Sequence, residues 1–163
     1  MRFLRKFRRQ FEVICIICDS KDIARQAAKD RRVDLLSFPS LDYHKRFFDR
    51  AEAELASCSL SALEVDLKPL LVMEGPARVR LLSSLRREVA VALEFHVPVV
   101  VSSGVGEENL LRSPRDLASL AYLFGLNTSS YFQITLMTQQ ASATILSSHC
   151  AKIPSNPGES SGW

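Results

Sequence analysis

The chain has 163 residues, of which 47% are hydrophobic, and carries a formal net charge of +3 at pH 7. That length and apolar content suffice for one sizeable core, so we predict a single domain over residues 1–150 and a disordered tail, rich in Pro, Gly and Ser, over residues 151–163. The apolar run at 13–18 is too short to cross a bilayer, and no apolar stretch of signal-peptide length follows the basic first ten residues. We therefore expect a cytoplasmic protein without membrane contact.

Hydrophobic periodicity predicts strands that alternate with helices along the chain. The strands are expected over Val13–Cys18, Val33–Phe38, Ala62–Leu67, Val97–Val101 and Tyr131–Met137. The helices are expected over Phe3–Phe11, Ser20–Asp30, Leu41–Ala56, Pro76–His96, Pro114–Phe124 and, weakly, Gln139–Ser148. Successive strand-then-helix units indicate an α/β fold with a parallel sheet and right-handed crossovers. No G-x-G-x-x-G follows the first strand, which argues against a dinucleotide-binding fold, and a TIM-barrel-like fold remains. Since about five units are too few to close an eight-stranded barrel, the barrel should be incomplete.

The segment from Val97 to Leu126 has the clearest signals for the boundaries of a strand and a helix. An apolar strand is followed by a loop and then by Ser113 and Pro114, which suit the N-cap and the first position of a helix. Asp116 completes a box-like S-x-x-D pattern, and Gly125 is placed to end the helix. The buried stripe of this helix should consist of Leu117, Leu120, Ala121 and Phe124.

The longest predicted helix should bury one apolar stripe. Its members are Val79, Leu82, Leu85, Val89 and Leu93. The neighbouring Arg86 and Arg87 are interpreted as a solvated face that Glu88 and Glu94 balance.

Cysteines and histidines do not form a recognisable metal or redox motif. Cys15 and Cys18 form a C-x-x-C, but residues three apart on a strand point to opposite faces, so we interpret them as buried structural thiols. His44, His96 and His149 are scattered and match neither H-x-H nor H-E-x-x-H. We expect no metal ligated by this chain.

Two features could support chemistry at the carboxyl ends of the strands. Glu64 and Asp66 share one face near the end of a strand, where α/β barrels place their active sites, and could act as acid and base or hold a metal. A carboxylate pair neutralised by Lys68 and nearby arginines is the favoured alternative. The Ser102–Gly104 segment could bind an anion through backbone N–H groups or simply form a tight turn.

Basic residues recur near loops and helix starts, which favours binding over catalysis. They are Arg25, Arg31, Arg32, Lys68, Arg78, Arg80, Arg112 and Arg115. Sets of this kind recognise phosphate backbones, with an affinity that falls as salt rises. The basic helix predicted at Phe3–Phe11, with Leu4, Phe7 and Phe11 on one face, is equally well explained as a solvated face or as an RNA contact.

Three motifs in order resemble the RNase P protein component 3 family of archaea and eukaryotes (p30-type). They are RVDLLSFP (Arg32–Pro39), ALEVDLKPLL (Ala62–Leu71) and SSGVGEENLLRSPRDLASLAYLFGL (Ser102–Leu126). The third resembles the family's "SS-A…R-x-P-(R/Y)-D-(L/V)" pattern in its archaeal "P-R-D" form. The arginine of the family's "R-P-L-L" motif is Lys68 here, which keeps the charge but loses bidentate phosphate geometry.

The resemblance implies a TIM-barrel-like fold related to the PHP phosphoesterases. It also implies a non-catalytic protein subunit of ribonuclease P, the ribonucleoprotein endonuclease that removes 5′ leaders from precursor tRNA. The catalytic RNA then does the chemistry with its own Mg²⁺, so the chain binds no cofactor. Its partners are that RNA, an RRM-like protein subunit and the other RNase P proteins, and it meets precursor tRNA indirectly.

Among the basic residues, Arg115 in the matched "P-R-D" is the first candidate for RNA binding. Arg25, Lys68, Arg112 and Arg78 follow it. Arg115 could instead pair with Asp116 or Glu108. Family members carry further N-terminal βα units, so the start of this chain is expected to be a truncation. The alternatives are a PHP-like phosphoesterase that uses Glu64 and Asp66 with a metal, or an inactive truncated paralogue.

Overall fold

A parallel sheet forms the centre of the computed structural model, which describes residues 3–38, 46–103, 111–126 and 150–153. The strand order is β4-β3-β2-β1-β5, and every neighbouring pair is parallel. The strands are β1 (Val13–Ile17), β2 (Leu35–Ser37), β3 (Ala62–Asp66), β4 (Val99–Ser102) and β5 (Cys150–Ile153). The helices are α1 (Phe3–Phe7), α2 (Lys21–Lys29), α3 (Arg50–Ser59), α4 (Lys68–Val72), α5 (Gly75–Glu94) and α6 (Pro114–Tyr122). The α/β class and parallel topology are confirmed, whereas the TIM-barrel-like arrangement with an incomplete barrel stays a prediction.

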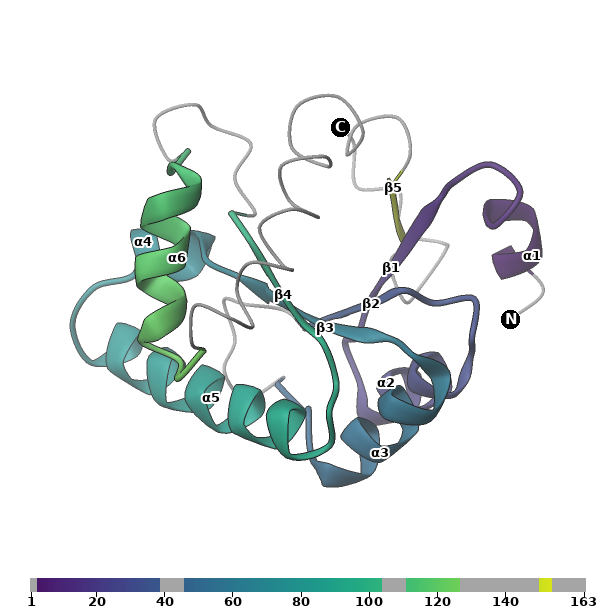
Figure 1. Cartoon of the computed structure of the whole chain (residues 1–163), viewed down its shortest axis with the longest axis horizontal. Helices are drawn as coiled ribbons and strands as arrows, with labels where there is room; N and C mark the ends of the chain where they lie inside the picture. The colour runs from purple at the N-terminus through teal and green to yellow at the C-terminus, as the bar shows by residue number, and fades with distance from the viewer. Residues whose placement is uncertain (1–2, 39–45, 104–110, 127–149, 154–163) are drawn as a thin grey trace.

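Helices α2, α3 and α5 lie together on one side of the sheet, below it in Figure 1. Alternate strand residues face this layer and form the core. They are Ile14, Ile16, Leu36, Leu63, Val65, Val99 and Val101, all buried. Helix α6 packs beside β4, and its C-terminal end meets α5, where the Arg86 guanidinium donates to the carbonyl of Leu123 (2.5 Å). Strands β1 to β4 stand in sequence order, so right-handed crossovers place the helices that connect them on the same face of the sheet.

The predicted helix Leu41–Ala56 starts later than expected. Residues 41–45 lie outside the described segments, and 46–49 are not helical. Asp49 is the N-cap: its carboxylate accepts the N–H groups of Ala51 (2.9 Å) and Glu52 (3.1 Å). Glu52 completes a capping box by accepting the N–H of Asp49 (3.1 Å). This capping box sets the start of α3.

The buried stripe of α5 is partly wrong in the prediction. Leu85 and Val89 are buried as expected, but Val79 is 62% and Leu93 43% exposed. The actual inward residues are Leu81, Leu85, Glu88, Val89 and Ala92. Because Glu88 is on the buried face, this face is rotated around the helix relative to the one that the apolar residues predict. Periodicity alone assigns a charged residue to solvent.

Glu88 is buried because it forms an ion pair with Arg46, which precedes α3. The guanidinium makes two hydrogen bonds to the carboxylate, of 2.8 and 2.5 Å, and both side chains are 1% exposed. Nearby, Arg50 reaches Glu94 at 2.9 Å on the surface. The predicted partnership of Glu88 and Glu94 with Arg86 and Arg87 is therefore wrong, although both of those arginines are exposed as expected.

Two further elements differ from the prediction. Helix α4 directly follows β3, with Pro69 in its first turn, and was not predicted. Strand β5 pairs with β1 and takes up 151–153, the first residues of the predicted tail. The predicted strand Tyr131–Met137 and helix Gln139–Ser148 lie outside the described residues. Within the part that the structure describes, no helix is long and apolar enough to span a membrane.

Candidate nucleic-acid interface

The start of α6 is a rigid turn closed by two reciprocal hydrogen bonds. The Ser113 hydroxyl accepts the N–H of Asp116 (3.3 Å), and the Asp116 carboxylate accepts the N–H of Ser113 (3.2 Å). Pro114 occupies the first turn, and Gly125 closes the far end with φ +84°, which strongly favours glycine. The predicted caps are confirmed. They fix the backbone that carries Arg115.

Arg115 is exposed on this turn, and its side chain takes no part in the cap. Its backbone carbonyl accepts the hydroxyl of Ser119 (3.0 Å). Asp116, one of the two alternative partners, is committed to Ser113; Glu108, the other, is outside the described residues. Among those residues Arg115 forms no ion pair. Within the described segments no other group binds the guanidinium, and its pairing with Glu108 stays a prediction.

Arg112 lies immediately before the same cap and is also exposed. Its guanidinium touches the carbonyl of Leu111 at 3.4 Å, a weak local contact that an external acceptor can replace. The short spacing keeps Arg112 and Arg115 on one turn. Arg112 and Arg115 therefore flank one helix cap.

Lys68 and Arg78 follow the carboxyl end of β3. The Asp66 carboxylate accepts the N–H of Lys68 (2.8 Å), which fixes the turn into α4. The guanidinium of Arg78, exposed in the first turns of α5, donates to the carbonyl of Met73 (2.5 Å). The N–H of Leu67 bonds to the carbonyl of Ser102 (3.0 Å), which ties the ends of β3 and β4. Helices α4 and α6 both lie on the left in Figure 1, at the side to which these strand ends lead.

We define the carboxyl-edge set as Lys68, Arg78, Arg112 and Arg115. All four belong to segments that follow the carboxyl ends of β3 and β4, so they share one edge of a parallel sheet. Lys68 is half-buried and the other three are exposed. An edge of this kind is where parallel α/β sheets place their binding residues.

Arg25 does not belong to this set. It lies on α2, and its Nε is 3.6 Å from Oε1 of Glu52, which is fully buried on α3. The ion pair joins two helices on the β1–β2 side of the molecule. The structure thus separates Arg25 from the other predicted residues and assigns it a contact within the fold.

Arg31 and Arg32 lie between α2 and β2. Arg32 is engaged by Asp30, with two hydrogen bonds of 2.7 and 2.5 Å, and this contact lowers the pKa of the Asp30 carboxyl. Arg31 and Arg80 are both exposed.

Burial has a large effect on Glu52. Desolvation, together with a hydrogen bond between the Glu52 and Asp49 side chains, raises the pKa of the Glu52 carboxyl to about 7, although the bond from the Asp49 N–H acts in the opposite direction. A hydrogen bond with the Glu52 side chain lowers the pKa of Asp49. Sequence reasoning missed Glu52 altogether. The only available signal was the E at the third position after Asp49, which is the capping-box pattern.

Glu64 and Asp66 share one face of the sheet, as predicted, and it is the face opposite the core residues. Each makes a contact within the fold. The Cys15 thiol donates to Oε2 of Glu64 (3.4 Å), and Asp66 binds the backbone of Lys68 rather than its ammonium group. Among the described residues, no three His, Cys, Asp or Glu side chains are placed to hold one metal ion. The hydroxyl of Ser102 is buried and has no hydrogen-bond partner among the described residues. Both interpretations of the Ser102–Gly104 segment, anion binding and a tight turn, stay predictions.

The cysteines are confirmed as buried thiols at the C-x-x-C. Neither Cys15 nor Cys18 forms a disulfide with a described residue, and both are fully buried. Burial, with the charges of Asp19 and Glu52, raises the pKa of Cys18 to about 12. A thiol with that pKa stays protonated and is a poor nucleophile or metal ligand. Of the histidines, only His96 falls within the described segments, just after α5 in a left-handed conformation with φ +57°.

Comparisons with known proteins agree with the three motifs. A family model described as "RNase P subunit p30" matches residues 1–152. Ribonuclease P protein component 3 of Methanosarcina barkeri is 35% identical over 121 residues, covering 74% of this chain and 50% of the relative. The protein of the same name from Methanocaldococcus jannaschii is 34% identical over 114 residues, covering 70% and 49%. The chain therefore spans about half the length of the curated relatives it matches.

A solved structure shares the fold. A chain in the cryo-EM structure of an archaeal ribonuclease P with mature tRNA is similar with a TM-score of 0.70 and 28% sequence identity. The match covers 86% of this chain and 64% of that one.

Proposed function

The chain belongs to the RNase P subunit p30 family, and on that premise we propose that it acts as a protein subunit of an archaeal-type ribonuclease P. In this role it supports the processing of tRNA 5′ ends without performing the cleavage itself. The observation that carries the proposal is the capped start of α6, which holds Arg112 and Arg115 exposed and outside ion pairs among the described residues.

Phosphate recognition explains why this geometry suits RNA. A guanidinium presents five N–H donors in a fixed fork, which matches two oxygens of one phosphate. A capped helix start lowers the mobility of the backbone that carries Arg115, so less conformational entropy is lost when its side chain is ordered. Lys68 and Arg78 extend the same charge along the carboxyl edge. Each phosphate contact releases counterions and makes the affinity salt-dependent.

The proposed partners follow from the same role. They are the catalytic RNA, an RRM-like protein subunit and the other RNase P proteins, with precursor tRNA met indirectly. The chemistry belongs to the RNA and its Mg²⁺, and the chain holds no cofactor in this proposal. We place the assembly in the cytoplasm.

Reconstitution of the ribonucleoprotein tests the proposal. The cognate RNA and partner proteins are assembled at low Mg²⁺ with or without the chain, and cleavage of precursor tRNA is measured. We expect cleavage to rise when the chain is added and to fall about tenfold for Arg115→Ala, the order of a lost charge-assisted phosphate contact. Arg87→Ala, which removes one exposed arginine from the middle of α5, is the matched control and should behave as the wild type.

Two results would overturn the proposal. One is equal cleavage at low Mg²⁺ with and without the chain. The other is Mn²⁺- or Zn²⁺-dependent turnover of a phosphoester by the isolated chain, abolished by Asp66→Asn, which would establish the phosphoesterase alternative instead.

A further inference from the structure

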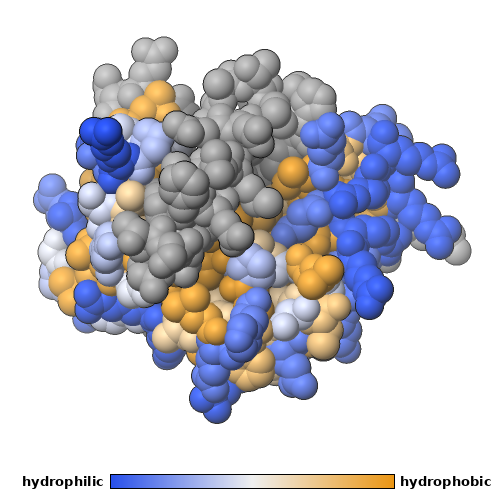
Figure 2. Space-filling view, in the orientation of Figure 1, coloured by the Kyte–Doolittle hydropathy of each residue, from blue (hydrophilic) through white to orange (hydrophobic). Residues whose placement is uncertain are grey.

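A second basic surface lies at the amino end of β1, far along the sheet order from β4. It surrounds a pocket of about 490 Å³ lined by Arg8, Arg9, Gln10, Phe11 and Glu12, which we call the α1 hollow. Helix α1 lies on the right in Figure 1, on the opposite side from α4 and α6. In Figure 2 hydrophilic side chains gather on that same side. The α1 hollow is therefore separate from the carboxyl-edge set.

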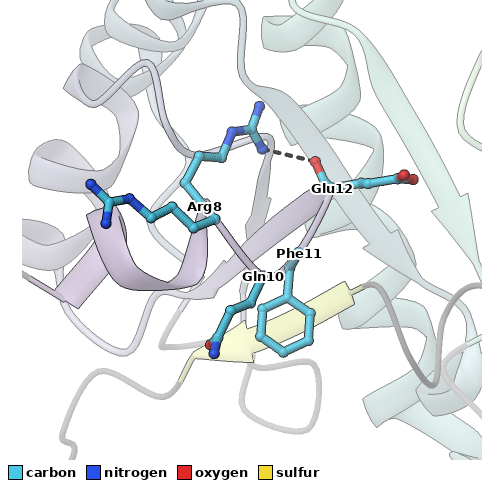
Figure 3. A pocket seen from close by; sticks show the side chains of 5 residues that line it. Arg8, Gln10, Phe11 and Glu12 are labelled. Carbon is cyan, nitrogen blue, oxygen red and sulfur yellow. Dashed lines mark hydrogen bonds between the residues drawn. The ribbon is translucent and has the colours of Figure 1, made fainter.

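The backbone of the α1 hollow is firmly held. The Arg8 guanidinium makes hydrogen bonds of 2.5 and 3.1 Å to Asp34 and one of 2.8 Å to the carbonyl of Glu12. Asp34 also accepts the N–H of Ile14 (2.7 Å), so one carboxylate joins the turn to the start of β1. Figure 3 shows Arg8 reaching back to Glu12 across the turn. The backbone around the pocket is thus preformed, which lowers the cost of binding.

The cations around the α1 hollow exceed its carboxylates. Arg5, Lys6 and Arg9 are exposed, and within the part of the chain that the structure describes none of them forms an ion pair. The Arg8–Asp34 contact also brings the α2–β2 connection, with its exposed Arg31, to this end of the sheet. Glu12 is the one carboxylate in the lining, so an anionic ligand is favoured.

The α1 hollow also offers an aromatic ring and an amide. Phe11 is half-buried, with its ring centroid 6.1 Å from that of Phe7 and the two planes at 31°. Figure 3 shows Gln10 and Phe11 pointing to the same side, next to β5. Phe7 supports one side of the Phe11 ring and leaves part of the ring at the pocket. A ring that accepts a stacked base beside cations that accept a phosphate is the arrangement used for single-stranded nucleic acids.

From these contacts we propose that the α1 hollow binds an unpaired RNA nucleotide. The base stacks on Phe11, Gln10 bonds to the edge of the base, and Arg9 with Arg5 or Lys6 contacts the flanking phosphates. The pocket volume lies in the range of small-ligand sites, which includes a nucleotide. This inference rests on the proposed function, because it adds a second contact between the same subunit and RNA.

Binding to short oligonucleotides tests the α1 hollow directly. The probes are a fluorescent oligouridylate and an abasic oligomer with the same backbone, and the readout is anisotropy with the full chain. Phe11→Leu keeps the packing on Phe7 but removes stacking, and should weaken binding to oligouridylate about tenfold while leaving the abasic oligomer unchanged. Phe11→Tyr should retain the wild-type affinity for both.

The proposed phosphate contacts are tested with Arg9→Gln. Arg87→Gln, which removes an equal charge from the middle of α5, is the control. Arg9→Gln should weaken both probes and reduce the salt slope by about 0.7, the value for one contact to a single strand. Unfolding midpoints of all variants serve to confirm that each one folds. Equal binding of oligouridylate by Phe11→Leu and the wild type overturns the proposal, as does binding of acidic peptides in preference to RNA.

The two proposals fail in different ways. If Phe11→Leu and Arg9→Gln bind oligouridylate as the wild type does while Arg115→Ala still lowers cleavage in the assembled ribonucleoprotein, only the α1 hollow is rejected. If the chain leaves cleavage unchanged but Phe11→Leu loses oligouridylate binding, the α1 hollow stands as an RNA site and the role in ribonuclease P is rejected.

Discussion

Arginines have opposite roles in two regions of this molecule. In the layer formed by α2, α3 and α5, Arg25, Arg46 and Arg50 each contact a carboxylate on a neighbouring element. At the start of α6, Arg112 and Arg115 are exposed and, among the described residues, form no ion pair. The first group contributes to how the helices pack, whereas the second is the one for which we propose contact with a partner. The comparison shows that a count of basic residues says little until each partner is known.

Burial sets how much each contact matters to folding. A buried carboxylate that loses its cation stays in a medium of low dielectric constant without compensation, which is strongly unfavourable. An exposed arginine without a partner is solvated in both the folded and the unfolded chain. Mutations of the two groups should therefore separate the effects on stability from the effects on RNA affinity.

The largest effect on stability is expected for Arg46→Met. It leaves Glu88 buried and unpaired on α5, so the free energy of unfolding should fall by about 3–5 kcal/mol in urea titrations. The double variant Arg46→Met with Glu88→Leu removes both charges and should recover most of the loss. A single variant within about 1 kcal/mol of the wild type would show that the pair is solvated in solution.

The second-largest effect on stability is expected from Glu52, which makes the free energy of unfolding depend on pH. Its pKa is about 7 in the folded chain, against ~4.3 in an unfolded one. The unfolded chain therefore loses this proton at a lower pH, and the contribution of Glu52 to stability, fully present below ~4.3, is lost as the pH rises through about 7. The lowered pKa of Asp49 acts only at the acidic end, below ~3.9. The titratable and charged groups that face the Glu52 carboxyl are Arg25, Asp49 and Cys18.

Glu52→Gln should abolish this dependence of the free energy of unfolding on pH. The amide can still accept the N–H of Asp49 but does not ionise, so stability between pH 5 and 8 should become flat where the wild type loses on the order of 2 kcal/mol. Glu54→Gln, an exposed change on the same helix, should keep the wild-type slope. The measurement is the unfolding free energy over a series of pH values. An unchanged slope in Glu52→Gln would assign the pH dependence to another group.

Local patterns explain which parts of the fold could be predicted from the sequence. The caps of α6 depend on Ser113, Asp116 and Gly125, which act within a few residues, and all three are confirmed. The face of α5 depends on Arg46, which is 42 residues from Glu88 in the chain. No local period carries that information, so Val79 and Leu93 were wrongly placed in the core.

The same reasoning applies to the candidate site. The exposure of Arg112 and Arg115 follows from their position beside a cap, which the sequence displays. Sequence patterns could not reveal the partner of Arg25, because Glu52 lies on another helix and is buried by tertiary packing. RNA binding by Arg25 stays a prediction. RNA contact by the carboxyl-edge set stays a prediction.

A smaller effect is expected at the cap of α6. Ser113→Ala removes the hydroxyl that accepts the N–H of Asp116, and should lower the free energy of unfolding by about 1 kcal/mol. Ser113→Asp keeps an acceptor at the N-cap and should stay close to the wild type. Ser113→Ala should also weaken RNA binding, but by less than Arg115→Ala, because the guanidinium is retained on a looser turn. Unfolding and binding titrations on the same samples measure both effects.

The smallest effect on stability is expected for Arg112→Gln, which makes the contrast between the two regions sharpest. The exposed side chain contacts only the adjacent carbonyl of Leu111, so stability should stay within about 0.5 kcal/mol of the wild type. Binding to the cognate RNA should weaken uniformly, and the slope of log affinity against log salt should fall by about one. Arg50→Gln is the matched control, because it removes an equal charge that is already paired with Glu94. It should cost up to about 1 kcal/mol of stability and leave the salt slope unchanged. If both variants change the slope equally, net charge rather than position governs RNA binding, and the distinction between the two regions disappears.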